Sequence, residues 1–179
     1  VASCSITTFG GSSAGGVVGE ARFTNILSCS SGGTLYSFSV NTGGILGTAF
    51  DGVLVDCCNS KKTMSADGEE AVAGGILGAS LSEVVLKNNS FGGIIYCSGK
   101  TVSLCGGIVG SYMGKLENSF VSGTVCSSLY FDETDENGET AENVIEKICV
   151  SSGIAAKGEN AIINNCYFII NNFNILLLY

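Results

Sequence analysis

The residues best suited to chemistry in this 179-residue chain are its nine cysteines. Such a density is typical of secreted proteins, in which disulfides supplement the hydrophobic core. Cys4, Cys29 and Cys57 occupy one position of the repeats described below, which predicts neighbouring coils and a first disulfide between Cys4 and Cys29. Cys97 and Cys126 are expected to bridge two later coils. The alternative is that the cysteines are buried free thiols that fill small apolar spaces.

Acidic residues indicate a possible metal site. Segment 132–139 is rich in carboxylates, and Glu133, Asp135 and Asn137 resemble the opening of a calcium-binding loop. The twelfth position of that loop is Val144, whereas the motif requires a bidentate glutamate. We therefore prefer a solvated acidic loop without a bound metal.

A pair of carboxylates, Asp51 and Asp56, is the candidate for polysaccharide cleavage. The two residues are five positions apart on an expected strand, so their side chains point to opposite faces. The chain also has no histidine and a single arginine, Arg22, which removes the commonest general base and leaves one phosphate-binding guanidinium. We expect no enzymatic activity and no cofactor.

The sequence Asn88-Asn89-Ser90 is an acceptor motif for N-glycosylation. Asn88, Asn118 and Asn165 also follow the same apolar block of their repeats. The alternative to a sugar at Asn88 is therefore a stacked asparagine ladder between coils.

Glycine-rich pentamers recur along the chain and define its organisation. Their first glycines are 28, 31 and 32 residues apart, which is a solenoid period. The four copies are Gly15-Gly16-Val17-Val18-Gly19, Gly43-Gly44-Ile45-Leu46-Gly47, Gly74-Gly75-Ile76-Leu77-Gly78 and Gly106-Gly107-Ile108-Val109-Gly110.

A degenerate fifth copy begins at Gly153, 47 residues after Gly106, which indicates an insertion at 131–146. We expect one repeat domain over 1–179, and we expect the chain to be a piece of a longer repeat protein. The predicted repeat units are 15–42, 43–73, 74–105, 106–152 and 153–179.

The local pattern of each repeat favours strands over helices. Apolar residues are β-branched, occur in short runs and are interrupted by glycine before a helix completes three turns. Equivalent segments of successive coils can then pair only in parallel and in register. The predicted fold is all-β: a right-handed parallel β-helix of about six coils with one acidic insertion loop.

Alternation along a strand predicts which apolar residues of the pentamers face the core. The third residues, Val17, Ile45, Ile76 and Ile108, are expected to stack inward. The fourth residues, Val18, Leu46, Leu77 and Val109, would then form an outward apolar stripe. That stripe is either a docking surface or is covered by the longer connections.

Residues 106–125 read GGIVG, then Leu-Glu-Asn-Ser-Phe, then Val-Ser-Gly-Thr-Val, and this arrangement resembles the GLUG repeat of large surface and secreted proteins. Other copies depart from it, with cysteine in place of a small polar residue at Cys29 and Cys57. The resemblance implies a β-helical, adhesin-like or filamentous surface protein, with no catalytic residue to transfer.

Composition and resemblance together predict a structural protein at the cell surface or outside the cell. The net charge of −8 disfavours nucleic acid, and no apolar run approaches the length of a membrane-spanning helix. The first hypothesis is end-to-end stacking into a filament, because β-helix ends expose strand edges. The alternative is an adhesin that binds a glycan or a protein through Tyr36, Tyr96, Tyr112 and Tyr130.

Overall fold

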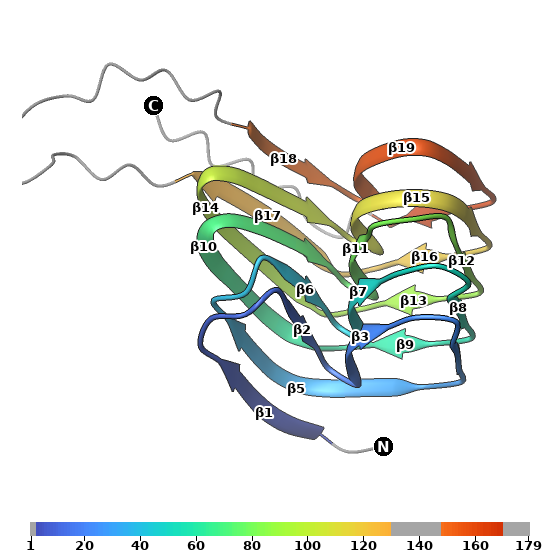
Figure 1. Cartoon of the computed structure of the whole chain (residues 1–179), viewed down its shortest axis with the longest axis horizontal. Coiled ribbons are helices and arrows are strands. Elements are labelled where there is room, and N and C mark those ends of the chain that lie inside the picture. The colour runs from blue at the N-terminus through green and yellow to red at the C-terminus, as the bar shows by residue number, and fades with distance from the viewer. Residues whose placement is uncertain (1–2, 130–147, 170–179) are drawn as a thin grey trace, which may run out of the picture.

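A computed structural model describes residues 3–129 and 148–169, which form an all-β parallel solenoid (Figure 1). One core position, followed from Ile6 through Leu35, Met64 and Ile95 to Val125, makes four turns of the coil. The predicted parallel β-helix is therefore confirmed as a parallel solenoid, with about four turns in place of six. The predicted insertion at 131–146 lies outside the described residues.

Equivalent strands of successive coils form five parallel stacks. The first contains β1 (Ser3–Thr8), β5 (Ser30–Ser37), β10 (Thr63–Gly74), β14 (Ile94–Gly106) and β17 (Thr124–Leu129). The second contains β2 (Ser13–Gly15), β6 (Asn41–Gly43), the ends of β10 and β14, and β18 (Ile148–Ser152). The third contains β3 (Val18–Ala21), β7 (Leu46–Ala49), β11 (Leu77–Ser80), β15 (Val109–Glu117) and β19 (Ala155–Asn164). The fourth contains β4 (Asn25–Leu27), β8 (Leu54–Asp56), β12 (Val84–Lys87) and the ends of β15 and β19. The fifth contains the start of β5 with β9 (Asn59–Ser60), β13 (Ser90–Phe91), β16 (Phe120–Val121) and β20 (Tyr167–Phe168).

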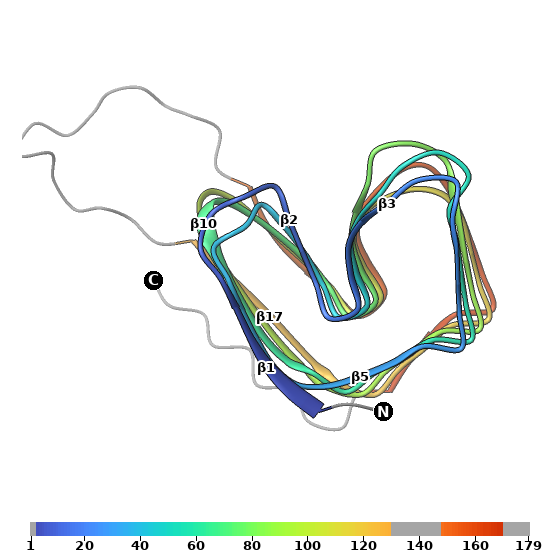
Figure 2. The same ribbon diagram turned by 60° about the horizontal axis from the view of Figure 1, so that its bottom comes forward.

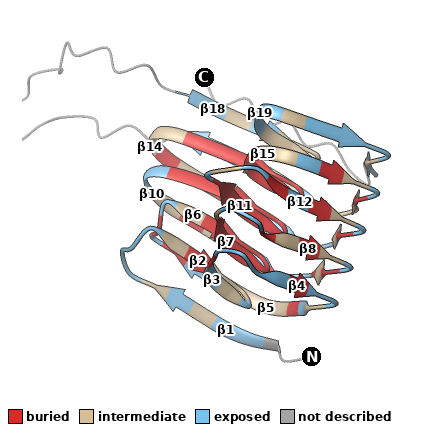
Figure 3. Cartoon of the chain, turned by 45° about the vertical axis from the view of Figure 1, so that its right-hand side comes forward, coloured by how far each residue is buried: buried red, intermediate tan, exposed pale blue. Residues whose placement is uncertain are grey.

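The core consists of apolar ladders that run along the solenoid axis. Leu35, Met64 and Ile95 are fully buried within the first stack. A second ladder, in the fourth stack, contains Ile26, Val55, Leu86 and Leu116. Burial is concentrated in the middle coils, whereas β1, β18 and β19 at the two ends are largely exposed (Figure 3). Each internal coil is thus stabilised by both of its neighbours.

The coil folds inward between the second and third stacks, so that its outline has two lobes (Figure 2). The glycines at the first and fifth pentamer positions face this fold. A Cβ at Gly78 would lie 2.7 Å from the backbone nitrogen of Thr42, and a Cβ at Gly47 would lie 2.8 Å from that of Ala14. Only glycine permits so close a backbone approach. We call this contact the glycine seam, and its positions are Gly15, Gly43, Gly47, Gly74, Gly78, Gly106 and Gly110; at Gly19, the equivalent position of the first coil, a Cβ would have no atom nearer than 3.8 Å.

The inward fold corrects the prediction of an outward apolar stripe. Leu46, Leu77 and Val109 have no exposed surface, and neither do Ile45 and Ile76 beside them. The chain bends sharply at the pentamer, so in the internal coils the two consecutive apolar side chains both enter the core, whereas Val17 of the first coil, which alternation predicts to face inward, is 46% exposed. Strand alternation, on which the prediction depended, does not apply across such a bend.

The tip of the inward fold packs against the opposite wall of the coil. A Cβ at Gly75 would meet the ring of Phe91, and one at Gly107 would meet Val121 at 2.8 Å. The second glycine of each pentamer therefore makes room for a core side chain from the fifth stack. Lys62 takes this place near the first coil; it is completely buried and its Nζ donates a hydrogen bond to the carbonyl of Gly32 at 2.8 Å.

Candidate functional site

A row of left-handed residues marks the corner between the fourth and fifth stacks. All five residues at this position have φ between 48° and 55° although none is glycine, and asparagine is one of the residues that tolerate this conformation best. We call them the outer corner ladder: Ser28, Cys57, Asn88, Asn118 and Asn165.

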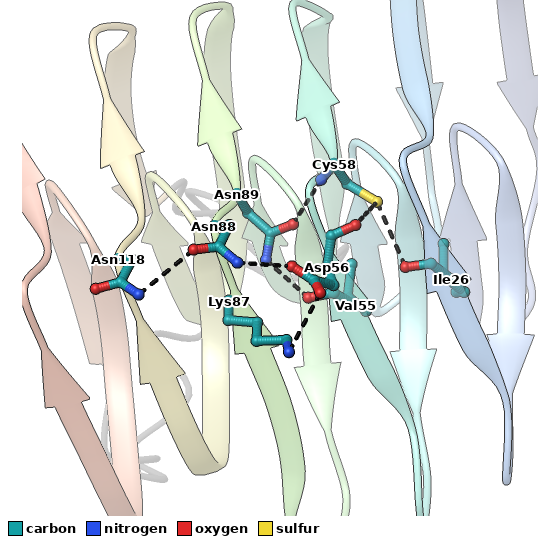
Figure 4. Close-up of polar contacts among 8 residues, drawn as sticks. All are labelled: Ile26, Val55, Asp56, Cys58, Lys87, Asn88, Asn89 and Asn118. Carbon is teal, nitrogen blue, oxygen red and sulfur yellow. Dashed lines mark hydrogen bonds and ion pairs between the residues drawn. The ribbon is translucent and has the colours of Figure 1, made fainter.

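Side-chain amides connect this outer corner ladder along the axis (Figure 4). Asn165 Nδ2 donates to Asn118 Oδ1 at 3.3 Å, and Asn118 Nδ2 donates to Asn88 Oδ1 at 3.4 Å. Asn88 Nδ2 then donates to Asp56 Oδ1 at 2.9 Å. The predicted asparagine ladder is therefore confirmed, whereas sugar attachment at the exposed Asn88 stays a prediction.

The next residue of each corner points inward and binds the neighbouring coil. The backbone N–H of Cys58 donates to Asn89 Oδ1 at 3.0 Å, and that of Asn89 donates to Ser119 Oγ at 3.2 Å. Asn89 Nδ2 also donates to the carbonyl of Val55 at 3.0 Å (Figure 4). Each side chain thus satisfies backbone groups of the preceding coil. We call this row the inner corner ladder: Cys29, Cys58, Asn89, Ser119 and Cys166.

The cysteines do not form the predicted disulfides, and all nine are free thiols. Cys4 lies opposite Gly33 rather than near Cys29, and Cys97 lies opposite Ser127 rather than Cys126. The equal-position argument fails because repeat lengths differ and strand register, not distance from the pentamer, decides which residues meet.

The alternative interpretation of the cysteines, as small buried fillers, describes three of them. Cys58, Cys97 and Cys105 are at most 2% exposed. Burial raises the pKa of Cys58 to about 11 and raises that of Cys105 well above its ordinary value. These two thiols therefore stay protonated at neutral pH, which makes them poor nucleophiles and poor metal ligands. Cys57, by contrast, is exposed at the outer corner.

Asp56, one of the two carboxylates considered for polysaccharide cleavage, contacts Asn88 and Lys87 of the next coil at the outer corner. The hydrogen bond from Asn88 lowers the pKa of its carboxyl, and Lys87 acts in the same direction from 3.3 Å. Asp51 lies in an exposed turn between β7 and β8. The carboxylate of Asp56 thus serves to hold neighbouring coils together.

The calcium candidates Glu133, Asp135 and Asn137 lie outside the described residues, as does Tyr130. Within 3–129 and 148–169, no group of three acidic or cysteine side chains is arranged to hold a metal ion. In the same residues no helix is long and apolar enough to cross a membrane.

The tyrosines predicted to contact a ligand have two different environments. Tyr112 is 1% exposed, and its hydroxyl donates to the carbonyl of Val84 at 3.0 Å, so it is a core residue and the prediction is wrong there. Burial raises its pKa well above the ordinary value. Tyr36 and Tyr96 are half exposed and face outward. Sequence spacing gives no sign of this difference because the coils vary in length.

The two ends of the described solenoid expose strand edges. Among the described strands, β3 pairs only with β7, and β19 pairs only with β15. One ladder position carries opposite charges at the two ends: Glu20 in the first coil and Lys157, which also pairs with Glu159 at 2.8 Å, in the last. Hydrogen bonds from Ser12 and Ser13 hold the pKa of Glu20 below its ordinary value, so this side chain is an anion at neutral pH.

Comparisons with protein-family models, with curated proteins and with solved structures give no match. The sites must therefore be interpreted from their own geometry.

Proposed function

We propose that this protein is a structural β-solenoid that assembles end to end with further copies of itself. The observation that carries the proposal is Gly19. At the equivalent positions Gly47, Gly78 and Gly110, a Cβ would collide with the wall of the preceding coil at 2.5–2.7 Å. At Gly19 the nearest atom to a Cβ would be 3.8 Å away, so the described fold has no need of glycine there. A further coil stacked on this end would bring its backbone against Gly19, and glycine would then be required there.

The charge ladder supports the same arrangement. A second copy stacked in register would bring its Glu20 to the next step beyond Lys157, at about 4.8 Å along the axis. Opposite charges at that spacing attract and favour one orientation of the two copies. The intervening members of the ladder, Thr48, Ala79 and Ser111, are uncharged, so Glu20 and Lys157 are the charged residues of this ladder.

Both corner ladders would also continue across the junction. Ser28 would follow Asn165 with the same left-handed backbone, and Cys29 would follow Cys166 on the inner side. In each internal coil, such a step provides a side-chain acceptor for a backbone N–H of the preceding coil. A junction with these contacts would therefore resemble the interior of the solenoid.

A charge swap tests the proposed junction. Glu20→Lys places two cations together and Lys157→Glu places two anions together, so each single variant should weaken association about ten-fold. The double variant restores the pair in reversed order and should recover assembly. Lys115→Glu changes the same charge away from this ladder and is the control. Sedimentation velocity at low salt measures the association.

A steric variant tests the register independently of charge. Gly19→Val should leave the stability of the monomer unchanged, because its surroundings are open, but should abolish stacking. Electron microscopy of the wild type should show filaments whose coils are spaced by about 4.8 Å along the filament axis. A wild-type protein that stays monomeric at high concentration, or Gly19→Val filaments that persist, would contradict the proposal.

The finer predictions from the sequence belong to the same proposal. A right-handed coil is the hand expected of parallel β crossovers, and the repeats are proposed to be of the GLUG type. An extracellular or cell-surface location is supported by that resemblance, since disulfides no longer support it. We propose a structural role rather than an enzymatic one.

A further inference from the structure

The outer face of the first stack carries two exposed tyrosines on one ladder. This ladder runs from Thr7 through Tyr36, Ser65 and Tyr96 to Cys126. Tyr36 is 49% exposed and Tyr96 is 51% exposed. Because they are two coils apart, their Cα atoms are separated by about 9.6 Å along the axis. Ser65 between them is small, so no bulky side chain stands between the two rings.

The neighbouring ladder on this face is rich in hydroxyl groups. It contains Ser5, Thr34, Thr63, Ile94 and Thr124. Thr34 Oγ1 donates to Ser5 Oγ at 2.8 Å, and Thr63 and Thr124 are exposed. Hydroxyls in this arrangement both donate and accept hydrogen bonds, as do the hydroxyls of a sugar.

Residues near the ends of these strands add aromatic surface and charge. The rings of Phe9 and Phe38 stack with their centroids 5.6 Å apart, and both are exposed. Asp67 accepts a hydrogen bond from Ser65 at 3.0 Å, and the exposed Lys61, two residues before Thr63, carries the opposite charge. The face is thus almost neutral although the whole chain has a net charge of −8.

We propose that this face binds an extended, neutral, β-linked polysaccharide that runs along the solenoid axis. Each sugar of such a chain advances by a distance close to one coil, so alternate sugars would lie on Tyr36 and Tyr96. The apolar faces of sugar rings pack on aromatic rings, while the tyrosine hydroxyls stay in water. Thr34 and Thr63 would bind the hydroxyls at the edge of the chain.

A long polymer fits this face better than a small molecule or an anionic glycan. Small ligands bind in concave sites that bury most of their surface, whereas a β-sheet face contacts a ligand from one side. Many weak contacts repeated along one polymer compensate for the weakness of each. The neutral face has no row of cations with which to bind a charged polysaccharide.

Tyrosine substitutions test the site directly. Wild-type protein should be retarded in gels that contain soluble mixed-linkage β-glucan, and Tyr36→Ala and Tyr96→Ala should each weaken binding about five-fold. The double variant should lose about 25-fold, since the sites are separate. Tyr36→Phe and Tyr96→Phe keep the ring and should bind nearly as well as the wild type. Leu81→Ala removes an exposed apolar side chain of the third-stack region and is the surface control.

Two control polysaccharides test the specificity of the face. Dextran, which is α-linked and not extended, and heparin, which is anionic, should both fail to bind. Failure of the wild type to bind β-glucan, equal binding by the alanine variants, or binding of heparin alone would overturn the proposal. Loss of a concentration-dependent dimer in the alanine variants would assign the face to a second copy of the chain instead. Performing all measurements in the Glu20→Lys background keeps glycan binding separate from end-to-end stacking.

Discussion

The glycine seam and the inner corner ladder are both repeated once per coil, but their sequences differ greatly in variability. The seam uses glycine at every position from Gly15 to Gly110. The corner uses Cys58, Asn89 and Ser119 for the same task. The difference follows from what touches the neighbouring coil: backbone in the seam, a short side chain at the corner.

This difference shows that a repeat position is restricted to one residue type only where its contact with the next coil excludes every other side chain. A backbone contact leaves no room for any side chain, so one residue type remains. A hydrogen-bonded corner needs a short group that accepts one bond and donates another, and amide, hydroxyl and thiol groups all meet that need. Ser152 and Ala156, at the two seam positions of the last described coil, depart from the rule at half-buried positions.

The largest effect is expected in the seam. Gly78→Val should cost about 4 kcal/mol of unfolding free energy or more, because its Cβ would lie 2.7 Å from the backbone of Thr42. Gly19→Val makes the same change at the same pentamer position in open surroundings, and should cost less than about 0.5 kcal/mol. Urea denaturation measures both. Equal costs at the two positions would show that strand propensity, not close approach, selects glycine.

The inner corner ladder should show a smaller and graded effect. Asn89→Ala leaves the N–H of Cys58 without its acceptor and removes the hydrogen bond to the carbonyl of Val55, and should cost about 1–3 kcal/mol of unfolding free energy. Asn89→Ser should recover about half of this loss, because Ser119 performs the same role in the next coil. Urea denaturation again provides the measurement. A serine variant no more stable than the alanine variant would contradict the interchangeability of corner residues.

The smallest effect is expected at the outer corner, as a dependence of stability on pH. The folded pKa of Asp56 is below its ordinary 3.8, so its contribution is present above pH 3.8 and is lost as the pH falls through the folded value. Asp56→Asn should therefore lower the melting temperature at pH 6 but not at pH 2. The difference in unfolding free energy between the wild type and Asp56→Asn should stay below about 1 kcal/mol, since the site is partly solvated. Asp51→Asn controls for the change in net charge; an equal effect from it would assign the dependence to overall charge.

Much of the fold follows from the sequence because the repeat is visible in the residues that cannot vary. The spacing of the pentamers predicts the solenoid, and short β-branched runs predict its parallel strands. The asparagine ladder is likewise predictable, because Asn88, Asn118 and Asn165 follow the same apolar block. These features depend on local pattern and on the period alone.

The candidate sites depend on register and on the path of the coil, which only the tertiary structure decides. Repeats of unequal length place Cys4 opposite Gly33 and bring Tyr36 and Tyr96 onto one ladder. The inward fold at the pentamer buries Leu77, which alternation would expose. Sequence determines which segments repeat, because it records the residues each contact requires. Structure determines which side chains meet, because that depends on how many residues each turn uses to return to the same place.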